Sequence, residues 1–379
     1  MQIERILEKS IIESLKPGKV LLLLGPRRVG KTFLLNKIFD EKSEKVVFWN
    51  GEDFAVHELL KRRSIENYKN LFAEKELLMI DEAQKIPKIG EVLKLIVDNL
   101  KYLKIVATGS SAFDVRNLSG EPLTGRKEDL LIFPISEKEI RKYESVIQHK
   151  DALLNRLVFG SMPELINYST FDKKSKYLKN LINSYLLKDI LAFENIKASD
   201  KILSLLRLIA FQIGSEVSLS EIGNHLSMSK NTVARYLDLL SKVFIIFKIS
   251  GFSRNLRKEV TKNSKWYFYD NGIRNALTAN LEPVSLRNDI GQLWENYTIS
   301  ERIKTQHYFN ITSNNYFWRT YDQQEIDWIE ERNGKLFAYE FKWKESKSKI
   351  PPAWKNNYPN SEFNQIHQSN FDEFLLLNR

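Results

Sequence analysis

The stretch that decides the fold is Gly25-Pro26-Arg27-Arg28-Val29-Gly30-Lys31-Thr32, which directly follows the apolar run 20–24. Its spacing is that of a P-loop, and it lies between an expected buried strand and a helix expected from Lys31 to about Phe39. Gly25 and Gly30 let backbone N–H groups approach a phosphate chain, toward which the helix N-terminus points. The stretch therefore predicts a site for ATP, in which Lys31 contacts the β and γ phosphates and Thr32 offers its hydroxyl to Mg²⁺.

A second strand-like segment, residues 77–80, ends in the acidic pair Asp81-Glu82, as a Walker B motif does. We expect Asp81 to hold Mg²⁺ through its water shell, and Glu82 to orient and deprotonate the water that attacks the γ phosphate. Paired acids at a strand end are common, and the P-loop upstream is what favours the catalytic interpretation. The pair predicts ATP hydrolysis in addition to binding.

Two further polar positions are candidates for the same site. A third strand, residues 104–108, is followed by Gly109-Ser110-Ser111, which would place the hydroxyl of Ser110 beside the γ phosphate as a sensor. Arg126 precedes another apolar strand, 130–135, and is a candidate arginine finger that acts within its own subunit or on a neighbour. An ordinary surface arginine is the alternative for Arg126.

Composition restricts the classes of function. The chain has 379 residues, 42% hydrophobic and 28% charged, which is enough for two or three domains. No apolar run approaches the roughly 18 residues that cross a bilayer, and no signal-peptide pattern is present, so we expect a cytoplasmic protein without membrane contact. The absence of cysteine and the scatter of the five histidines leave an oxygen-bound Mg²⁺ or Mn²⁺ as the expected metal. A net charge of +10 favours a polyanionic partner, although dispersed lysines also serve solubility.

The rhythm of strands and helices predicts the domain order. Strand-like runs alternate with segments of helical spacing up to residue 136, which predicts an α/β P-loop NTPase domain with a mostly parallel sheet over residues 1–136. The strand signal then fades, and we expect a helical linker or lid domain over residues 137–199.

Residues 200–283 have the pattern of a winged helix. A short helix at 218–226 is followed by a turn and a second helix that begins at Lys230. We expect this second helix to contact DNA, with phosphates and base edges met by Lys230, Asn231, Thr232 and Arg235.

A basic wing should follow, between strands near 244–249 and 266–269. Its cations would lie on a phosphate backbone and comprise Arg254, Arg257, Lys258, Lys262 and Lys265. Winged helices also dock on proteins, and a purely protein-binding role is the alternative.

The last third of the chain combines Glu295 on an expected helix, Asp327, and Glu340-Phe341-Lys342. Glu340 and Lys342 alternate with aromatic residues, so a strand would place both on one face, and a hairpin would bring Asp327 beside Glu340. This resembles the D…E-x-K core of PD-(D/E)xK nucleases and implies an α/β restriction-endonuclease-like domain over residues 284–379. There Asp327, Glu340 and Glu295 would be metal ligands, and Lys342 would be the catalytic lysine that steers a water toward a phosphodiester. Ordinary alternation in a half-exposed sheet is the alternative.

Taken in order, the motifs resemble a prokaryotic family of AAA+-like ATPases that join an archaeal-type ATPase module to a C-terminal domain of unknown function. The resemblance covers nearly the whole chain and is carried by residues 25–32, 81–84, 108–111, 125–126, 159–164, 267–272, 295–296, 325–327 and 340–342. It implies ATP binding with hydrolysis, a winged helix and a nuclease-like tail. The chain differs from similar sequences at Gln323, where glycine is usual in the hairpin.

Two functions remain open at this stage. In the first, ATP turnover repositions the winged helix and the nuclease-like tail on DNA, with cleavage by the tail as an open alternative. In the second, the chain is a nucleotide-dependent switch for a protein partner, and its nuclease-like domain is inactive. Assembly into a homo-oligomer is compatible with both.

Overall fold

The computed structural model describes residues 2–40, 43–110, 123–186, 199–253, 264–347 and 349–376. The chain divides into two compact units. The first comprises Met1–Ile135 with Lys242–Phe244, and the second comprises Ser136–Ser241 with Ile245–Arg379. Among the described residues, no helix is both long and apolar enough to span a membrane.

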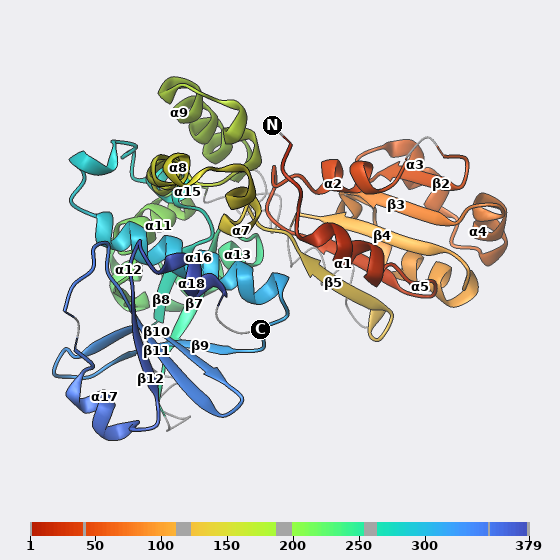
Figure 1. The fold of residues 1–379 in the computed structure, drawn as a ribbon. Helices are drawn as coiled ribbons and strands as arrows, with labels where there is room; N and C mark the ends of the chain where they lie inside the picture. The colour runs from red at the N-terminus through yellow and green to blue at the C-terminus, as the bar shows by residue number, and fades with distance from the viewer. Residues whose placement is uncertain are drawn as a thin grey trace. The chain divides into compact units, whose positions relative to one another are not determined.

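A five-stranded parallel sheet forms the centre of the first unit, with strand order β2-β3-β4-β1-β5 and helices on both sides (Figure 1). Its strands are rich in Val, Ile and Leu because both faces of such a sheet are covered. The strand β1 is buried throughout and lies between β4 and β5, with which it pairs. The strands are β1 (Val20–Leu24), β2 (Val46–Asn50), β3 (Leu77–Asp81), β4 (Lys104–Gly109) and β5 (Lys127–Leu131).

The last of these strands differs from its predicted position, residues 130–135. It begins earlier because Lys127 pairs with Val20 at the start of β1, and the register then runs to Leu131 beside Leu24. The apolar residues that follow, such as Ile132 and Phe133, are buried but lie beyond the strand. Hydrophobicity alone therefore misplaced the strand bounds.

The helices of the first unit bury one apolar stripe each, at the spacing expected of amphipathic helices. The clearest case is α5, which buries Val92, Leu93, Ile96 and Val97. These helices are α1 (Leu7–Ser14), α2 (Lys31–Ile38), α3 (Phe54–Lys61), α4 (Ile65–Phe72) and α5 (Ile89–Asn99).

A mixed seven-stranded sheet organises the second unit, with strand order β12-β11-β10-β9-β7-β8-β6. It takes strands from both sides of residue 283, so the ranges predicted to form a winged helix and a nuclease-like domain contribute to one sheet. The four-domain division stays a prediction. The strands are β6 (Glu216–Val217), β7 (Ile246–Gly251), β8 (Ser264–Phe268), β9 (Asn314–Arg319), β10 (Glu325–Arg332), β11 (Lys335–Phe341) and β12 (Glu362–Ile366).

The helix α16 (Ile290–Tyr308) is largely buried in the second unit, and it carries charged residues into the interior. Each is paired: the guanidinium of Arg302 binds both carboxylate oxygens of Glu330, and Lys304 binds Glu301 at 2.6 Å. Buried charges are tolerated only when they are paired in this way. The other helices are α7 (Glu137–Ile140), α8 (Val146–Phe159), α9 (Phe171–Asn180), α11 (Ser199–Phe211), α12 (Leu219–Leu226), α13 (Lys230–Lys242), α15 (Asn271–Leu277), α17 (Pro352–Asn357) and α18 (Phe371–Leu376).

The unusual residue Gln323 lies in the turn between β9 and β10. Its φ of 63° is in the left-handed region, where glycine is favoured over other residues. The turn therefore forms with a glutamine in a backbone conformation that favours glycine. Within it, Gln323 N donates a hydrogen bond to Thr320 O at 3.1 Å.

Candidate nucleotide site and acidic site

The P-loop has the backbone geometry that its spacing predicts. A Cβ at Gly25 would lie 2.1 Å from the carbonyl oxygen of Ile132, so no other residue fits there without a shift of the backbone. Gly30 caps α2 with a φ of 92°, again a glycine conformation. The ammonium of Lys31 is buried and donates to the carbonyl oxygens of Gly25 at 2.9 Å and Pro26 at 3.0 Å. The loop therefore curls around its own lysine.

The loop is also held from behind by Arg5, which the sequence reasoning missed. Arg5 is buried, and its guanidinium donates to Val29 O at 3.0 Å and to Phe133 O at 2.6 Å. One side chain thus fixes the P-loop to the chain segment after β5. No local pattern identifies it, because its partners lie 24 and 128 positions away.

Oxygen atoms suited to Mg²⁺ lie next to the loop. The hydroxyl of Thr32 donates to Oδ2 of Asp81 at 2.8 Å, and the hydroxyl of Thr108 donates to Oδ1 at 2.5 Å. A hydroxyl and a carboxylate in contact fit the all-oxygen coordination that Mg²⁺ prefers. Thr32 and Asp81 would hold the ion, as the sequence predicts.

The acid expected to act as base, Glu82, belongs to a three-residue group. Its φ is 48°, and its carboxylate accepts a hydrogen bond of 2.7 Å from Nε2 of Gln84. The same Nε2 donates to the hydroxyl of Ser110 at 3.2 Å. Oε1 of Gln84 is buried and has no hydrogen-bond partner among the described residues. The predicted base and the predicted sensor are therefore joined by Gln84, which the sequence reasoning did not single out; Ser111 lies outside the described residues.

Arg126 lies at the N-terminal end of the parallel strands, whereas the P-loop follows the C-terminal end of β1. Its carbonyl accepts from Val20 N at the first residue of β1, whereas the P-loop follows the last residue, Leu24. Four strand steps correspond to about 13 Å, which exceeds the reach of an arginine side chain. Its Nε binds Asp98 at 2.6 Å, and this hydrogen bond lowers the pKa of Asp98. Arg126 therefore does not reach the phosphates of its own P-loop, and action on a neighbouring subunit stays a prediction.

In the second unit, Asp327 and Glu340 lie on adjacent antiparallel strands, where Trp328 pairs with Tyr339. The pairing of β10 with β9 shifts register between Ile326 and Ile329, which inserts an extra residue where Asp327 lies. Oδ2 of Asp327 accepts from Phe341 N at 2.8 Å. A bulge of this kind redirects a side chain, and nothing in the sequence identified it.

Glu295, Asp327, Glu340 and Lys342 form a charged cluster that we call the acidic site. Glu340 accepts from the ammonium of Lys342 at 2.6 Å. Burial lowers the pKa of Lys342, but the hydrogen bond and the charges of Glu340, Asp327 and Glu295 raise it overall. Burial and the charges of Glu295 and Glu340 raise the pKa of Asp327 well above its ordinary range. The carboxylates thus repel one another in a partly desolvated environment.

Residues of β8 complete this cluster. The hydroxyl of Tyr267 donates to Glu295 Oε1 at 2.6 Å, and the ammonium of Lys265 lies 3.7 Å from the same oxygen. Lys265 also makes a short ion pair with Glu325. Burial raises the pKa of Glu295, and Lys265 and Tyr267 oppose that rise. Glu295 is therefore held by a buried cation and a hydroxyl, whereas Asp327 and Glu340 lie on neighbouring strands and would be the pair that takes a divalent cation, as the sequence predicts.

The position of Lys265 contradicts its expected role in the wing. Its side chain is only 1% exposed, so it does not face a phosphate backbone. It lies on β8, a strand whose five residues, Ser264–Phe268, are all buried. The other expected wing residues, Arg254, Arg257, Lys258 and Lys262, lie outside the described residues.

The second helix of the expected winged helix is α13, joined to α12 by residues 227–229. Gly223 lies against this turn, and Met228 N donates to its carbonyl at 2.9 Å. Lys230, Asn231 and Arg235 are exposed. Thr232 is half-buried, and its N–H donates to Ser229 Oγ at 3.1 Å, so it completes the helix N-terminus.

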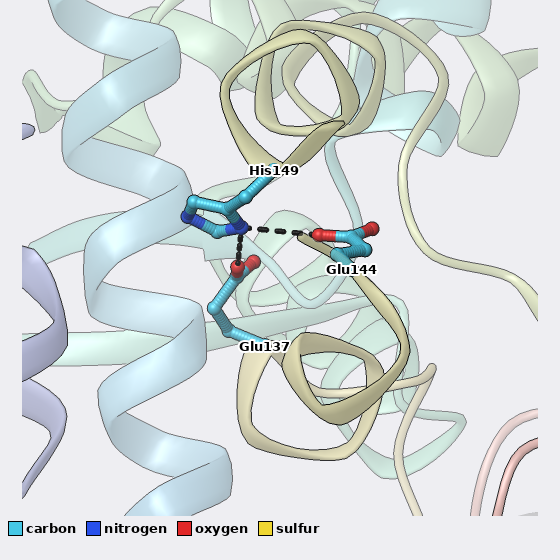
Figure 2. Close-up of side chains that lie close together, drawn as sticks. All are labelled: Glu137, Glu144 and His149. Carbon is cyan, nitrogen blue, oxygen red and sulfur yellow. Dashed lines mark hydrogen bonds and ion pairs between the residues drawn. The ribbon is translucent and has the colours of Figure 1, made fainter. Parts of the chain in front are cut away.

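A third charged group contains Glu137, Glu144 and His149 (Figure 2). Nδ1 of His149 lies 3.0 Å from Glu144 and 3.2 Å from Glu137. Arg156 binds the same two carboxylates, at 2.9 Å to Glu137 and 2.5 Å to Glu144. A metal ion would compete with this guanidinium, and the group is a structural ion-pair network in the second unit.

Comparison with known proteins agrees with the geometry of the first unit. Residues 17–141 match the model of an AAA domain, and this range contains the P-loop, Asp81, Glu82 and Ser110. Residues 150–284 and 290–362 match two domains of unknown function, DUF8612 and DUF4143. The first unit therefore has an AAA-type P-loop ATPase fold, a class of protein that binds ATP.

Relatives span most of the chain at low identity. An uncharacterized protein of Mycobacterium tuberculosis is 23% identical over 87% of this chain and 71% of its own length. One from Haemophilus influenzae is 26% identical over 81% of this chain and 78% of its own length.

Among solved structures, a Signal Transduction ATPase with Numerous Domains from Pyrococcus horikoshii is 15% identical with a TM-score of 0.33. That similarity covers 82% of this chain but only 46% of the Pyrococcus chain. The score is too low to support an argument about the arrangement of the whole molecule.

Proposed function

We propose that this chain is a Mg²⁺-dependent ATPase that acts on DNA, and that its second unit contacts DNA through α13 and the acidic site. The observation that carries the proposal is the acidic site itself. Four residues from α16, β10 and the end of β11 converge although up to 47 positions separate them, from Glu295 to Lys342. A sheet with ordinary alternation does not require that convergence.

The ATPase chemistry rests on residues of the first unit. Lys31 neutralises phosphate charge, and Glu82 takes the proton of the attacking water. Bound Mg²⁺ supplies charge neutralisation of the phosphate oxygens, and Thr32 and Asp81 would hold it. Ser110 would report the state of the nucleotide to Glu82 through Gln84.

Contact with DNA is supported by the exposed polar residues of α13 and by the net charge of +10. Cleavage is the further step that the acidic site would make possible. Asp327 and Glu340 would hold a divalent ion that lowers the pKa of a water, and Lys342 would orient that water.

The test measures ATP turnover and DNA affinity on the intact chain at several salt concentrations. DNA should stimulate turnover, and the logarithm of affinity should fall linearly with the logarithm of salt concentration. If DNA affinity does not depend on salt concentration and DNA does not stimulate ATP turnover, the proposed action on DNA is wrong. The proposed ATPase activity would not be affected by that result.

The second candidate function is a nucleotide-dependent protein switch with an inactive acidic site. The buried ammonium of Lys265 favours it, because a fixed cation neutralises part of the carboxylate charge without a metal. This function predicts slow hydrolysis and a protein partner bound in only one nucleotide state. Equal binding of partners with ATP and ADP would contradict it.

A further inference from the structure

Lys265 is the most completely buried cation of the acidic site. Its side chain is 1% exposed, and its ammonium lies between Glu325 and Glu295. The ammonium is also 5.3 Å from the centre of the Phe317 ring, which contributes a weak attraction. Burial lowers the pKa of Lys265, but the charges of Glu295, Asp327 and Glu325 raise it overall. Lys265 is therefore charged at neutral pH.

The charges around it do not balance. Glu295, Glu325, Asp327 and Glu340 provide four carboxylates, and Lys265 and Lys342 provide two ammonium groups. Arg319 lies farther out, 3.9 Å from Glu325. The site can accept a further cation beyond those that the chain supplies.

We propose that Lys265 is the resident counter-cation of the acidic site and that it sets how tightly a divalent ion binds to Asp327 and Glu340. This inference rests on the acidic site described under the proposed function. The ammonium holds Glu295 and Glu325 in place while the divalent position is vacant. It also repels an incoming divalent ion, so binding is weak in the natural chain.

The geometry supports this division of roles. Tyr267 and Lys265 hold Glu295 in place. Among the described contacts, Lys265 makes no hydrogen bond to Asp327 or Glu340. Lys342 pairs with Glu340 from a half-exposed position and can move away from it. Lys265 has no such freedom because it is enclosed by the sheet.

The experiment is a calorimetric titration of the intact, nucleotide-free chain with Mn²⁺ at low ionic strength. Lys265→Met removes the charge and keeps the length of the side chain. It should tighten Mn²⁺ binding by at least about tenfold, because a buried positive charge in the same cluster of carboxylates opposes the binding of a divalent ion. Lys265→Arg keeps the charge and should bind Mn²⁺ within about threefold of the natural chain.

Two controls separate this inference from the proposed function. Asp327→Asn in the Lys265→Met background should remove the tight Mn²⁺ binding, which assigns it to the acidic site. Lys248→Met removes an exposed lysine of β7 and should leave Mn²⁺ affinity unchanged. Failure of DNA to stimulate ATP turnover would reject the proposed function and would not affect these affinities.

Equal Mn²⁺ affinity in the natural chain and Lys265→Met, or equal tightening by Lys265→Arg, would overturn the inference. In the Met variant two carboxylates lose this partner, and in the limiting case the variant folds only with metal. Thermal unfolding with and without Mn²⁺ covers that case. Folding that is restored by Mn²⁺ supports the inference, and a variant that stays unfolded in Mn²⁺ overturns it.

Discussion

At the scale of single residues, the proposed ATP hydrolysis depends on Glu82 as the base. Glu82→Gln removes the group that takes a proton from water but keeps the size of the side chain. We expect ATP turnover to fall by about 10²- to 10⁴-fold while ATP still binds. Single-turnover hydrolysis and equilibrium binding of ATP measure the two effects separately. Unchanged turnover would dismiss Glu82 as the base.

Gln84 provides a second test at this scale, because it connects Glu82 with Ser110. Gln84→Leu removes both hydrogen bonds and should lower kcat by about tenfold or more without a matching change in ATP affinity. Gln84→Glu keeps the length of the side chain but loses the donor, and should show a similar loss. Normal kcat in both variants would mean that Gln84 only fills space.

Asp327 illustrates the energetic cost of a carboxylate that is buried beside other carboxylates. Because its pKa is raised in the folded state, its contribution to stability is lost as the pH rises through the folded pKa. Asp327→Asn avoids this loss and should raise the free energy of unfolding at pH 8 by about 1 kcal/mol. The gain should shrink at pH 5, where the aspartate is more protonated. Denaturant unfolding with a chelator present measures it, and a stability loss at pH 8 would contradict the argument.

At the scale of elements, α13 carries the prediction of nucleic-acid contact. Lys230 is exposed at its first residue and can be removed without opening the core. Lys230→Ala should weaken DNA binding for all sequences and reduce the salt slope by about one. Lys248→Ala, on β7, is the matched control and should leave both unchanged. Identical salt slopes in the two variants would exclude α13 from the interface.

The elements themselves were largely predictable, because each strand and helix is encoded by a local period. The apolar run before the P-loop, the strand that ends at Asp81 and the two helices around residues 227–229 all lie where the sequence indicates. Strand β5 was misplaced, because its bounds depend on pairing with β1. The register of that pairing cannot be predicted from local hydrophobicity.

The sequence predicted the central residues of the candidate sites. It did not predict the side chains that hold those residues in place. Lys31, Thr32 and Asp81 are fixed by motifs, and Asp327 and Glu340 by strand alternation and hairpin pairing. The supporting side chains make hydrogen bonds or ion pairs that no local sequence pattern indicates; they are Arg5, Gln84 and Lys265. Those contacts form only when the elements pack. The same reason explains the misassignment of Lys265 to a wing.

At the scale of the whole molecule, the chain comprises an AAA-type ATPase unit and a second unit with the acidic site, and we propose that ATP binding begins each functional cycle. Calorimetric titration of the intact chain with ATP and Mg²⁺ tests that claim most directly, with Lys31→Ala as the matched variant. The account predicts saturable heat with one site per chain for the natural protein and its loss in the variant. A folded natural protein that gives no heat with Mg-ATP would contradict it.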